Sequence, residues 1–253
     1  MKITFLGTGT SQGVPVITCS CKVCTSINKK DTRLRTSILI QSAEATIVVD
    51  TGPDFRYQML RANVKTLSAV IYTHEHKDHT AGLDDIRAFN YSEKRETALY
   101  AHPRVQEAIR REFAYIFSEI KYPGIPKVKF VDIGNKEFQI SDLSIQPIEV
   151  MHYHLPVLGF RINDFVYITD AKTISESEMD KIRNCKVLVL NALQRDPHIS
   201  HFTLEEALAM IKILNPEIAY LTHISHRLGT HDEVTAELPN NVFLAFDGLQ
   251  LDL

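Results

Sequence analysis

Three histidines and an aspartate crowd into one short stretch of this 253-residue chain. The stretch reads Thr73-His74-Glu75-His76-Lys77-Asp78-His79. Imidazole nitrogens and carboxylate oxygens are ligands for divalent metal ions. The alternation of His74 and His76 lets both face one ion, while Asp78 and His79 can turn toward a second. The stretch therefore predicts a metal site and not a solvated polar loop.

Further residues of the same ligand type follow along the chain. His152, Asp170 and His223 each come directly after a short apolar segment. Alone, each would be interpreted as a turn or cap residue, but together with the histidine stretch they predict a binuclear site. One ion would take His74, His76 and His152, the other would take Asp78, His79 and His223, and Asp170 would bridge them. Two ions about 3.5–4 Å apart suit in-line displacement at an ester or phosphodiester.

Strands must position these residues. Apolar, β-branched segments lead into them: Ala69–Tyr72 before the histidine stretch, Phe165–Thr169 before Asp170 and Ile218–Thr222 before His223. Loops at strand ends hold ligands on a rigid scaffold.

Strand-like and helix-like segments alternate along the whole chain. The predicted helices are Pro53–Asn63, Pro103–Phe117, Ser175–Arg183 and Thr203–Leu214. Two similar halves, each with strands followed by helices, predict an α/β fold, a four-layer αββα sandwich, in one domain over residues 1–253.

The ligand pattern resembles the metallo-β-lactamase-fold hydrolases. The matching residues are His74-x-His76-x-Asp78-His79, followed by His152, Asp170 and His223 in the family's order. The resemblance implies two divalent ions, manganese or zinc, and hydrolysis by a water activated between them. Asp50-Thr51-Gly52 also matches, which implies that Asp50 supports a ligand imidazole. His154 is the alternative to His152, although the spacing to Leu158-Gly159-Phe160 favours His152.

Three further features resemble the subgroup of the phosphoribosyl cyclic phosphate phosphodiesterases (PhnP-like). The first is a glycine-rich amino-terminal loop, Gly7 to Pro15, which alone indicates either a phosphate contact or an ordinary turn. The second is Cys19-x-Cys21-x-x-Cys24 together with His226, for which the resemblance implies a structural zinc. Thiolates suit zinc, and three cysteines with one histidine close a tetrahedral site. Cys185, by contrast, is predicted to be a small buried side chain.

The third feature is His201, just before a helix whose Thr203 and Glu206 form a capping box. A helix entrance favours an anion, and the resemblance implies that His201 is a general acid or a phosphate contact. We count Asp78 with His201 as catalytic.

Composition excludes several function classes. Lysine plus arginine total 28 and aspartate plus glutamate total 31, a net charge of −3, which argues against wholesale wrapping of nucleic acid. No apolar run reaches the ~20 residues that span a bilayer, and the first residues do not resemble a secretory signal. We expect a cytoplasmic enzyme acting on a small-molecule phosphodiester, without nucleic-acid or membrane partners; the resemblance suggests a homodimer.

The predicted function is therefore a binuclear metal-dependent phosphodiesterase acting on a small phosphodiester, with cyclic ribosyl phosphates among its candidate substrates. Three alternatives remain open: an RNA-processing phosphodiesterase of the tRNA 3′-end nuclease type, a thioester or lactone hydrolase, and a non-catalytic ligand sensor. The aromatic segment Tyr115–Pro126 is interpreted as a connection in preference to a lid.

Overall fold

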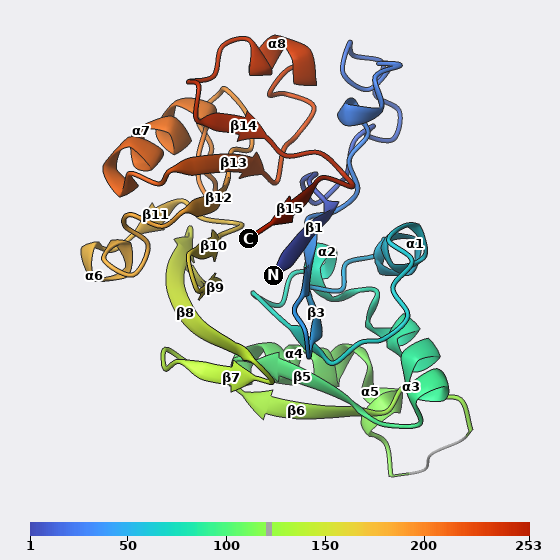
Figure 1. Cartoon of the computed structure of the whole chain (residues 1–253). Helices are drawn as coiled ribbons and strands as arrows, with labels where there is room; N and C mark the ends of the chain where they lie inside the picture. Colours follow the sequence, from blue (N-terminus) through green and yellow to red (C-terminus); the bar gives the residue numbers. More distant parts are fainter. Residues whose placement is uncertain (120–122) are drawn as a thin grey trace.

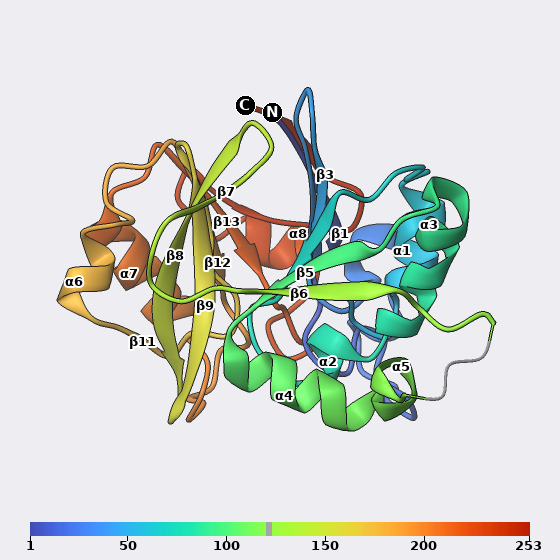
Figure 2. The ribbon, with the colours of Figure 1, turned by 90° about the horizontal axis from the view of Figure 1, so that it is seen from below.

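Two β-sheets face each other, and helices cover the outer side of each (Figures 1 and 2). The structure is a computed structural model that describes residues 1–119 and 123–253. This arrangement confirms the four-layer αββα sandwich expected from the alternation of segments.

The first sheet has seven strands in the order β15-β1-β2-β3-β4-β5-β6. Parallel pairing runs from β3 to β6, and the first and last strands of the chain pair antiparallel with each other. Its strands are β1 Lys2–Gly7, β2 Ser37–Gln41, β3 Thr46–Val49, β4 Ala69–Ile71, β5 Thr97–Ala101, β6 Val128–Asp132 and β15 Gln250–Asp252.

The second sheet has the order β11-β8-β9-β10-β12-β13-β14, with β7 paired to β8. A long antiparallel hairpin, β8–β9, leads into parallel strands from β10 to β14. Its strands are β7 Phe138–Ile140, β8 Leu143–His152, β9 Leu155–Ile162, β10 Phe165–Tyr167, β11 Thr173–Ile174, β12 Val187–Asn191, β13 Ile218–Thr222 and β14 Val242–Leu244.

Most of the helices are short. The α-helices are α1 Phe55–Arg61, α2 Lys77–Thr80, α3 Arg87–Glu93, α4 Pro103–Glu112, α5 Ala114–Phe117, α6 Glu176–Met179, α7 Leu204–Leu214 and α8 His231–Thr235, and the 3-10 helices are η1 Lys29–Asp31 and η2 Leu83–Ile86. No helix in the described ranges is long and apolar enough to cross a membrane.

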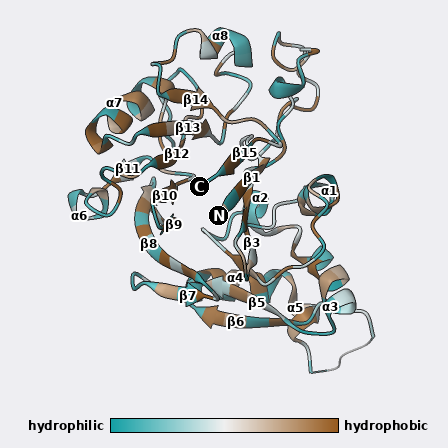
Figure 3. Cartoon of the chain, viewed as in Figure 1, coloured by the Kyte–Doolittle hydropathy of each residue, from teal (hydrophilic) through white to brown (hydrophobic). Residues whose placement is uncertain are grey.

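Three buried clusters match the spaces between the four layers. Phe5, Phe160 and Tyr167 belong to the cluster between the two sheets. A second cluster packs one sheet against α7, and a third packs the other against α1, α3 and α4. Figure 3 shows hydrophobic residues concentrated in strands such as β13 and β14. Each sheet therefore has apolar contacts on both faces and presents its strand ends as the exposed edge.

Several predicted elements differ from those observed. The single helix expected over Pro103–Phe117 divides into α4 and α5 because Phe113 has φ −110° and ψ 42°, outside the helical region. Only α6 forms within the helix expected over Ser175–Arg183. Part of Tyr115–Pro126, residues 120–122, lies outside the described residues, so the interpretation as a connection stays a prediction.

The capping box at α7 is confirmed. Thr203 Oγ1 accepts a hydrogen bond from the Glu206 amide at 3.2 Å, and Glu206 Oε2 accepts one from the Thr203 amide at 2.9 Å. These bonds satisfy two amides at the helix start. They fix the entry of the chain into α7, immediately after His201.

Candidate active site

The seven predicted ligand residues all come together at strand ends of the two facing sheets. Two of them lie in the loop after β4, two in the short helix α2 that follows this loop, and the other three at or just beyond the ends of β8, β10 and β13. They are His74, His76, Asp78, His79, His152, Asp170 and His223.

One set of ligand atoms comes from Asp78, His79, Asp170 and His223. These atoms all lie within 4.8 Å of one another. His79 Nε2 lies 3.3 Å from both Asp78 Oδ2 and Asp170 Oδ2, and His223 Nε2 lies 3.4 Å from Asp170 Oδ1. The structure thus brings together the second set predicted from the sequence and adds Asp170 to it.

A second set of ligand atoms also includes Asp170. His152 and His201 form a group with Asp170 within the same 4.8 Å limit. His74 Nε2 and His76 Nδ1 face each other at 3.0 Å, and the His152 ring centroid lies 5.9 and 5.2 Å from theirs. Asp170 belongs to both groups, which is the position expected of a bridging carboxylate. His154 is exposed in the β8–β9 turn, whereas His152 is turned inward.

These residues fit divalent metal ions. Ligands about 2.0–2.2 Å from one tetrahedral ion lie about 3.3 Å apart, close to the 3.3 and 3.4 Å separations around Asp170. His79 Nε2 is buried and has no hydrogen-bond partner. An unpartnered buried nitrogen aimed at two carboxylates is the donor arrangement that an ion completes.

The pKa shifts of the ligand residues also fit a site for positive ions. Burial alone would raise the pKa of Asp170, but His223 and His79 hold it well below its usual value. Burial likewise opposes ionisation of Asp78, and His79 lowers the pKa of that carboxyl. Against its burial, Asp170, Asp78 and Asp50 raise the pKa of His79 well above its usual value. The ionised carboxylates of Asp170 and Asp78 thus favour a positive charge at the place where the ligand atoms converge.

A layer of hydrogen bonds orients the imidazoles. Asp50 Oδ2 lies 2.7 Å from His79 Nδ1, while the amide and hydroxyl of Thr73 donate to Asp50 at 2.9 and 2.8 Å. The Ser200 carbonyl lies 2.8 Å from His152 Nδ1. Such partners fix the tautomer and leave the opposite ring nitrogen free for a metal.

The sequence pointed to Asp50 but not to Thr73 or Ser200. Thr73 directly precedes the histidine stretch, which is the only local signal it offers. The Ser200 contact is made by a backbone carbonyl, and no side-chain pattern reveals such a partner.

The backbone is strained at three site residues. Asp50, Asp170 and His223 have φ of 65°, 53° and 55°, a conformation uncommon outside glycine. Gly52 is required by close packing, because a Cβ there would lie 2.2 Å from the Asp78 carbonyl oxygen. The Asp50-Thr51-Gly52 turn therefore rests directly against the ligand loop.

His201 lies inside the site, as predicted. Its ring centroid is 4.4 Å from that of His152 and 4.8 Å from that of His223, and its Nε2 is 3.9 Å from Asp170 Oδ1. Burial, reinforced by His223, lowers the pKa of His201 to about 2. A neutral ring still offers one N–H to a phosphate oxygen. The choice between general acid and phosphate contact stays a prediction.

The cysteine cluster forms a separate site. Cys19, Cys21 and Cys24 place their Sγ atoms 3.3, 3.4 and 3.5 Å from His226 Nδ1. Bond lengths to zinc of about 2.3 Å for sulfur and 2.0–2.1 Å for nitrogen give a tetrahedral edge of about 3.5 Å. The Cys24 amide donates to Cys21 Sγ and lowers the pKa of that thiol to about 6. Cys185 is buried elsewhere.

The glycine-rich loop is explained by packing. A Cβ at Gly7 would lie 1.9 Å from the Arg35 carbonyl oxygen. The loop also pairs through Gly9 with Arg35 and with Ile224. Glycine is needed for this close approach, so its presence here is not by itself a sign of phosphate binding.

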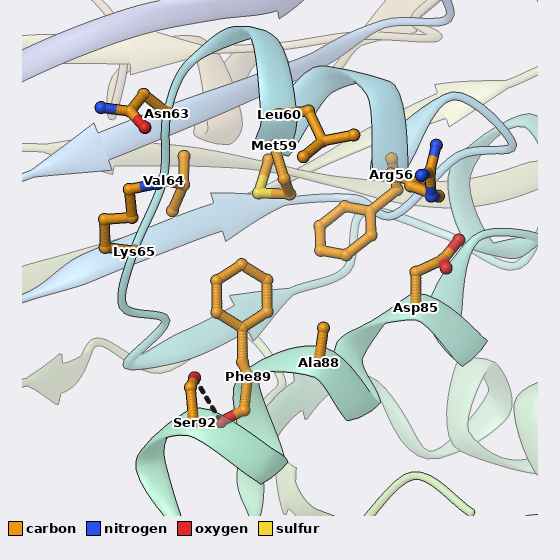
Figure 4. A pocket seen from close by; sticks show the side chains of 11 residues that line it. Arg56, Met59, Leu60, Asn63, Val64, Lys65, Asp85, Ala88, Phe89 and Ser92 are labelled. Atoms are coloured by element: carbon orange, nitrogen blue, oxygen red, sulfur yellow. Dashed lines mark hydrogen bonds between the residues drawn. The ribbon is translucent and has the colours of Figure 1, made fainter.

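A hollow of about 410 Å³ lies apart from these sites, between α1 and α3 (Figure 4). Apolar side chains such as Met59, Val64 and Phe89 line it, and Arg56 and Lys65 lie at its border. None of the predicted site residues lines it. The predicted chemistry thus has no connection with this hollow.

Comparisons with known proteins agree with this geometry. The model of the beta-lactamase superfamily domain matches residues 45–224. A curated octanoyltransferase of Porphyromonas gingivalis is 41% identical over 254 residues, covering 99% of this chain and 51% of the relative. This chain thus spans about half the length of that relative.

Solved structures show the same fold. A structure described as a new diphosphatase from the PhnP family has a TM-score of 0.94 and 34% identity, covering all of this chain and 97% of the other. Zn²⁺-bound PqqB from Methylobacterium extorquens has a TM-score of 0.82 and 19% identity, with complete coverage of both chains. The chain therefore belongs to the beta-lactamase superfamily, as a PhnP-like metal-dependent hydrolase with the metallo-β-lactamase fold.

Proposed function

We propose that this hydrolase cleaves a small phosphodiester at a binuclear metal site. The observation that carries the proposal is Asp170, a buried carboxylate that lies in two groups of ligand atoms, one with Asp78, His79 and His223 and one with His152 and His201. The similarity to a PhnP-family diphosphatase supports phosphorus–oxygen chemistry. Cyclic ribosyl phosphates and diphosphates are the substrate classes to examine first.

Two divalent ions held by the seven ligand residues would activate a water and offset charge on the phosphate oxygens. The chain's own contribution is positioning. Asp50 and the Ser200 carbonyl fix the rings of His79 and His152 through their Nδ1 atoms. His201 lies beside both groups, where it can contact a phosphate oxygen or protonate the departing oxygen.

We also propose a structural zinc held by Cys19, Cys21, Cys24 and His226. Four protein ligands leave no open position, which is the pattern of a structural site and not of a catalytic one. The cluster joins the amino-terminal loop to the segment after β13, some 200 residues away in sequence.

Octanoyl transfer is not part of the proposal. The relative with that name is about twice as long as the matched region, so its name does not assign the reaction to this half. The name of this relative nevertheless suggests a specific substrate for the thioester-hydrolase alternative, an octanoyl thioester, and the substrate panel below includes it.

The test is a substrate panel with manganese-loaded protein: bis-p-nitrophenyl phosphate, a ribosyl cyclic phosphate, a nucleoside diphosphate, pre-tRNA and an octanoyl thioester. We expect turnover of the small phosphodiesters to exceed that of pre-tRNA and of the thioester. Preferential thioester or pre-tRNA cleavage would replace the proposal by the corresponding alternative, and no turnover at all would favour the ligand sensor.

A matched pair of variants ties activity to the site. Asp78→Asn should lower kcat/KM for bis-p-nitrophenyl phosphate about 100-fold or more, because an amide is a poor substitute for an anionic ligand. Asp84→Asn changes a half-buried carboxylate away from the metal site, where it pairs with Arg87 and accepts a hydrogen bond from the Tyr115 hydroxyl. Its kcat/KM should stay within about twofold of the parent.

A further inference from the structure

A second hollow opens directly beside the ligand residues. It measures about 450 Å³, and its lining includes His76, His152, Tyr153, His154 and Ile199. This volume lies within the range of small-molecule sites, about 300–1,000 Å³. His76 and His152 belong to both the metal site and the hollow. A phosphate ester bound at the ligand residues would therefore have this hollow directly beside it.

One wall of the hollow is aromatic. Tyr153 and His154 form the two-residue turn between β8 and β9, and their ring centroids are 3.8 Å apart with the planes inclined at 45°. The Tyr153 side chain is 55% exposed. Figure 2 shows the free end of the β8–β9 hairpin at the lower edge of the view. The two rings thus stand in solvent next to the inward-facing His152.

The backbone at Tyr153 is unusual for its side chain. Its φ is 59°, a conformation that two-residue hairpin turns assign to glycine or asparagine. A bulky aromatic residue in this region is an outlier, and such strain gathers at binding sites. The turn would form more readily with a smaller residue. We therefore infer that the aromatic ring of Tyr153 serves ligand binding and not the formation of the turn.

Another part of the lining is aliphatic. Ile199 is 71% exposed although it is a large apolar residue. The hydrogen-bond contact between the Ser200 carbonyl and His152 Nδ1, at 2.8 Å, ties the Ile199 loop to the end of β8. A contact inside the metal site thus joins the loop that carries Ile199 to the strand that leads into Tyr153.

The charge of the lining residues limits which chemical groups the hollow can bind. None of the residues described around it is an acid, a lysine or an arginine. A second phosphate would need cationic partners of the kind that Arg and Lys supply. Exposed rings and an aliphatic side chain instead suit a flat, uncharged, partly aromatic group.

We propose that this hollow, bounded by Tyr153, His154 and Ile199, binds the nucleobase of a nucleotide substrate whose phosphate lies at the metal ions. The proposal rests on the proposed phosphodiesterase function and narrows its substrate class to nucleoside-bearing esters. The base lies against Tyr153 on one side and Ile199 on the other, while the sugar spans the distance to His152.

The experiment compares two ligands that differ only in the base. Adenosine 5′-monophosphate and ribose 5-phosphate are titrated into manganese-loaded protein by calorimetry, and each is measured as an inhibitor of bis-p-nitrophenyl phosphate hydrolysis. Base stacking at exposed aromatic residues corresponds to about 5- to 150-fold in affinity. We expect the adenosine compound to bind at least about tenfold more tightly. Equal affinities would overturn the proposal.

Variants test whether the preference for adenosine 5′-monophosphate over ribose 5-phosphate arises at this hollow. Tyr153→Asn removes the ring in a residue that tolerates positive φ, and should reduce the preference to about twofold or less, whereas Tyr153→Phe should keep it. Ile199→Ala should weaken it partly. Tyr57→Asn is the control, because Tyr57 is 57% exposed but lies on α1, on the outer side of the other sheet. A preference that survives Tyr153→Asn at parental strength would contradict this location.

The same assay separates the two proposals. Hydrolysis of bis-p-nitrophenyl phosphate without any base preference overturns the nucleobase site and leaves the phosphodiesterase intact. Absence of phosphodiester hydrolysis removes the proposed function itself, and the nucleotide-substrate proposal with it, whatever the calorimetry shows. Melting temperatures of all variants within a few degrees of the parent exclude misfolding as the cause.

Discussion

The two ligand clusters of this protein are built in opposite ways. The active-site cluster takes its residues from the ends of strands in both sheets, buries Asp170 and provides hydrogen-bond partners for His79 and His152. The cysteine cluster draws three ligands from one short loop, is only partly buried and adds a single distant histidine. The fold fixes the geometry of the active-site cluster, whereas the cysteine cluster would itself fix the conformation of the loop that carries its cysteines.

This difference predicts how each cluster responds to damage. Removing a residue from the buried cluster leaves unpaired charge in a site the fold keeps rigid, so chemistry should fail while the fold persists. Removing a thiol frees a loop, so stability should fall while the chemistry persists.

The largest expected effect is that of Asp170→Ala. Loss of the carboxylate shared by both groups should lower turnover by more than the ~10–100-fold that follows loss of an outer partner, and should reduce active-site metal. Zinc bound by the cysteine cluster should stay constant. Elemental analysis together with bis-p-nitrophenyl phosphate kinetics checks this, and retention of both metal and turnover would refute the bridging position.

Asp50→Asn should have an intermediate effect. The amide keeps the size of the side chain but cannot accept from Thr73 and orient His79 as the carboxylate does. Metal affinity or activity should fall about 10–100-fold. A shift in the metal concentration needed for half-maximal activity measures the loss. An unchanged metal requirement with unchanged activity would show that Asp50 does not orient His79.

The smallest expected effect on catalysis is that of Cys21→Ser. It should remove the cluster's zinc and lower Tm by about 5 °C, on a scale of about 2–4 °C per kcal/mol for a domain of this size. Activity per loaded active site should change little. Cys185→Ala is the control, because Cys185 lies outside the cluster and its loss should not alter zinc content. Unchanged zinc content in Cys21→Ser would contradict the structural site.

Much of the site was predictable because the residues that bind metals are chemically distinctive. Seven ligand candidates were identified from residue type and position after apolar segments, whereas the supporting role of Asp50 and the grouping of His226 with the cysteines came from the resemblance to known families. The pairings within them were less predictable. His152 groups with Asp170 and His201 while His74 faces His76, a matter of side-chain direction that spacing does not encode.

The fold was predictable at the level of layers and less so at the level of element bounds. The break at Phe113 depends on one residue's backbone angles within a stretch whose apolar spacing continues. Strand β5 was missed because Thr97–Ala101 is short and follows a charged segment. The turn at Tyr153 was not predicted because its residues do not favour positive φ.

The segment from His223 to His226 belongs to both clusters, three residues apart. Between them, the Ile224 amide donates to the Thr8 carbonyl at 2.9 Å, and the Ile224 carbonyl accepts from Thr10 at 3.1 Å. The cysteine cluster is complete only when residues more than 200 positions apart have met, and the active-site cluster only when His74 and His223, 149 positions apart, have met. Both are late events in folding because distant loop closure is slow. A metal ion held by the full ligand set at either place is thus a marker of finished folding, because each set lacks one histidine, His223 or His226, until β13 has docked.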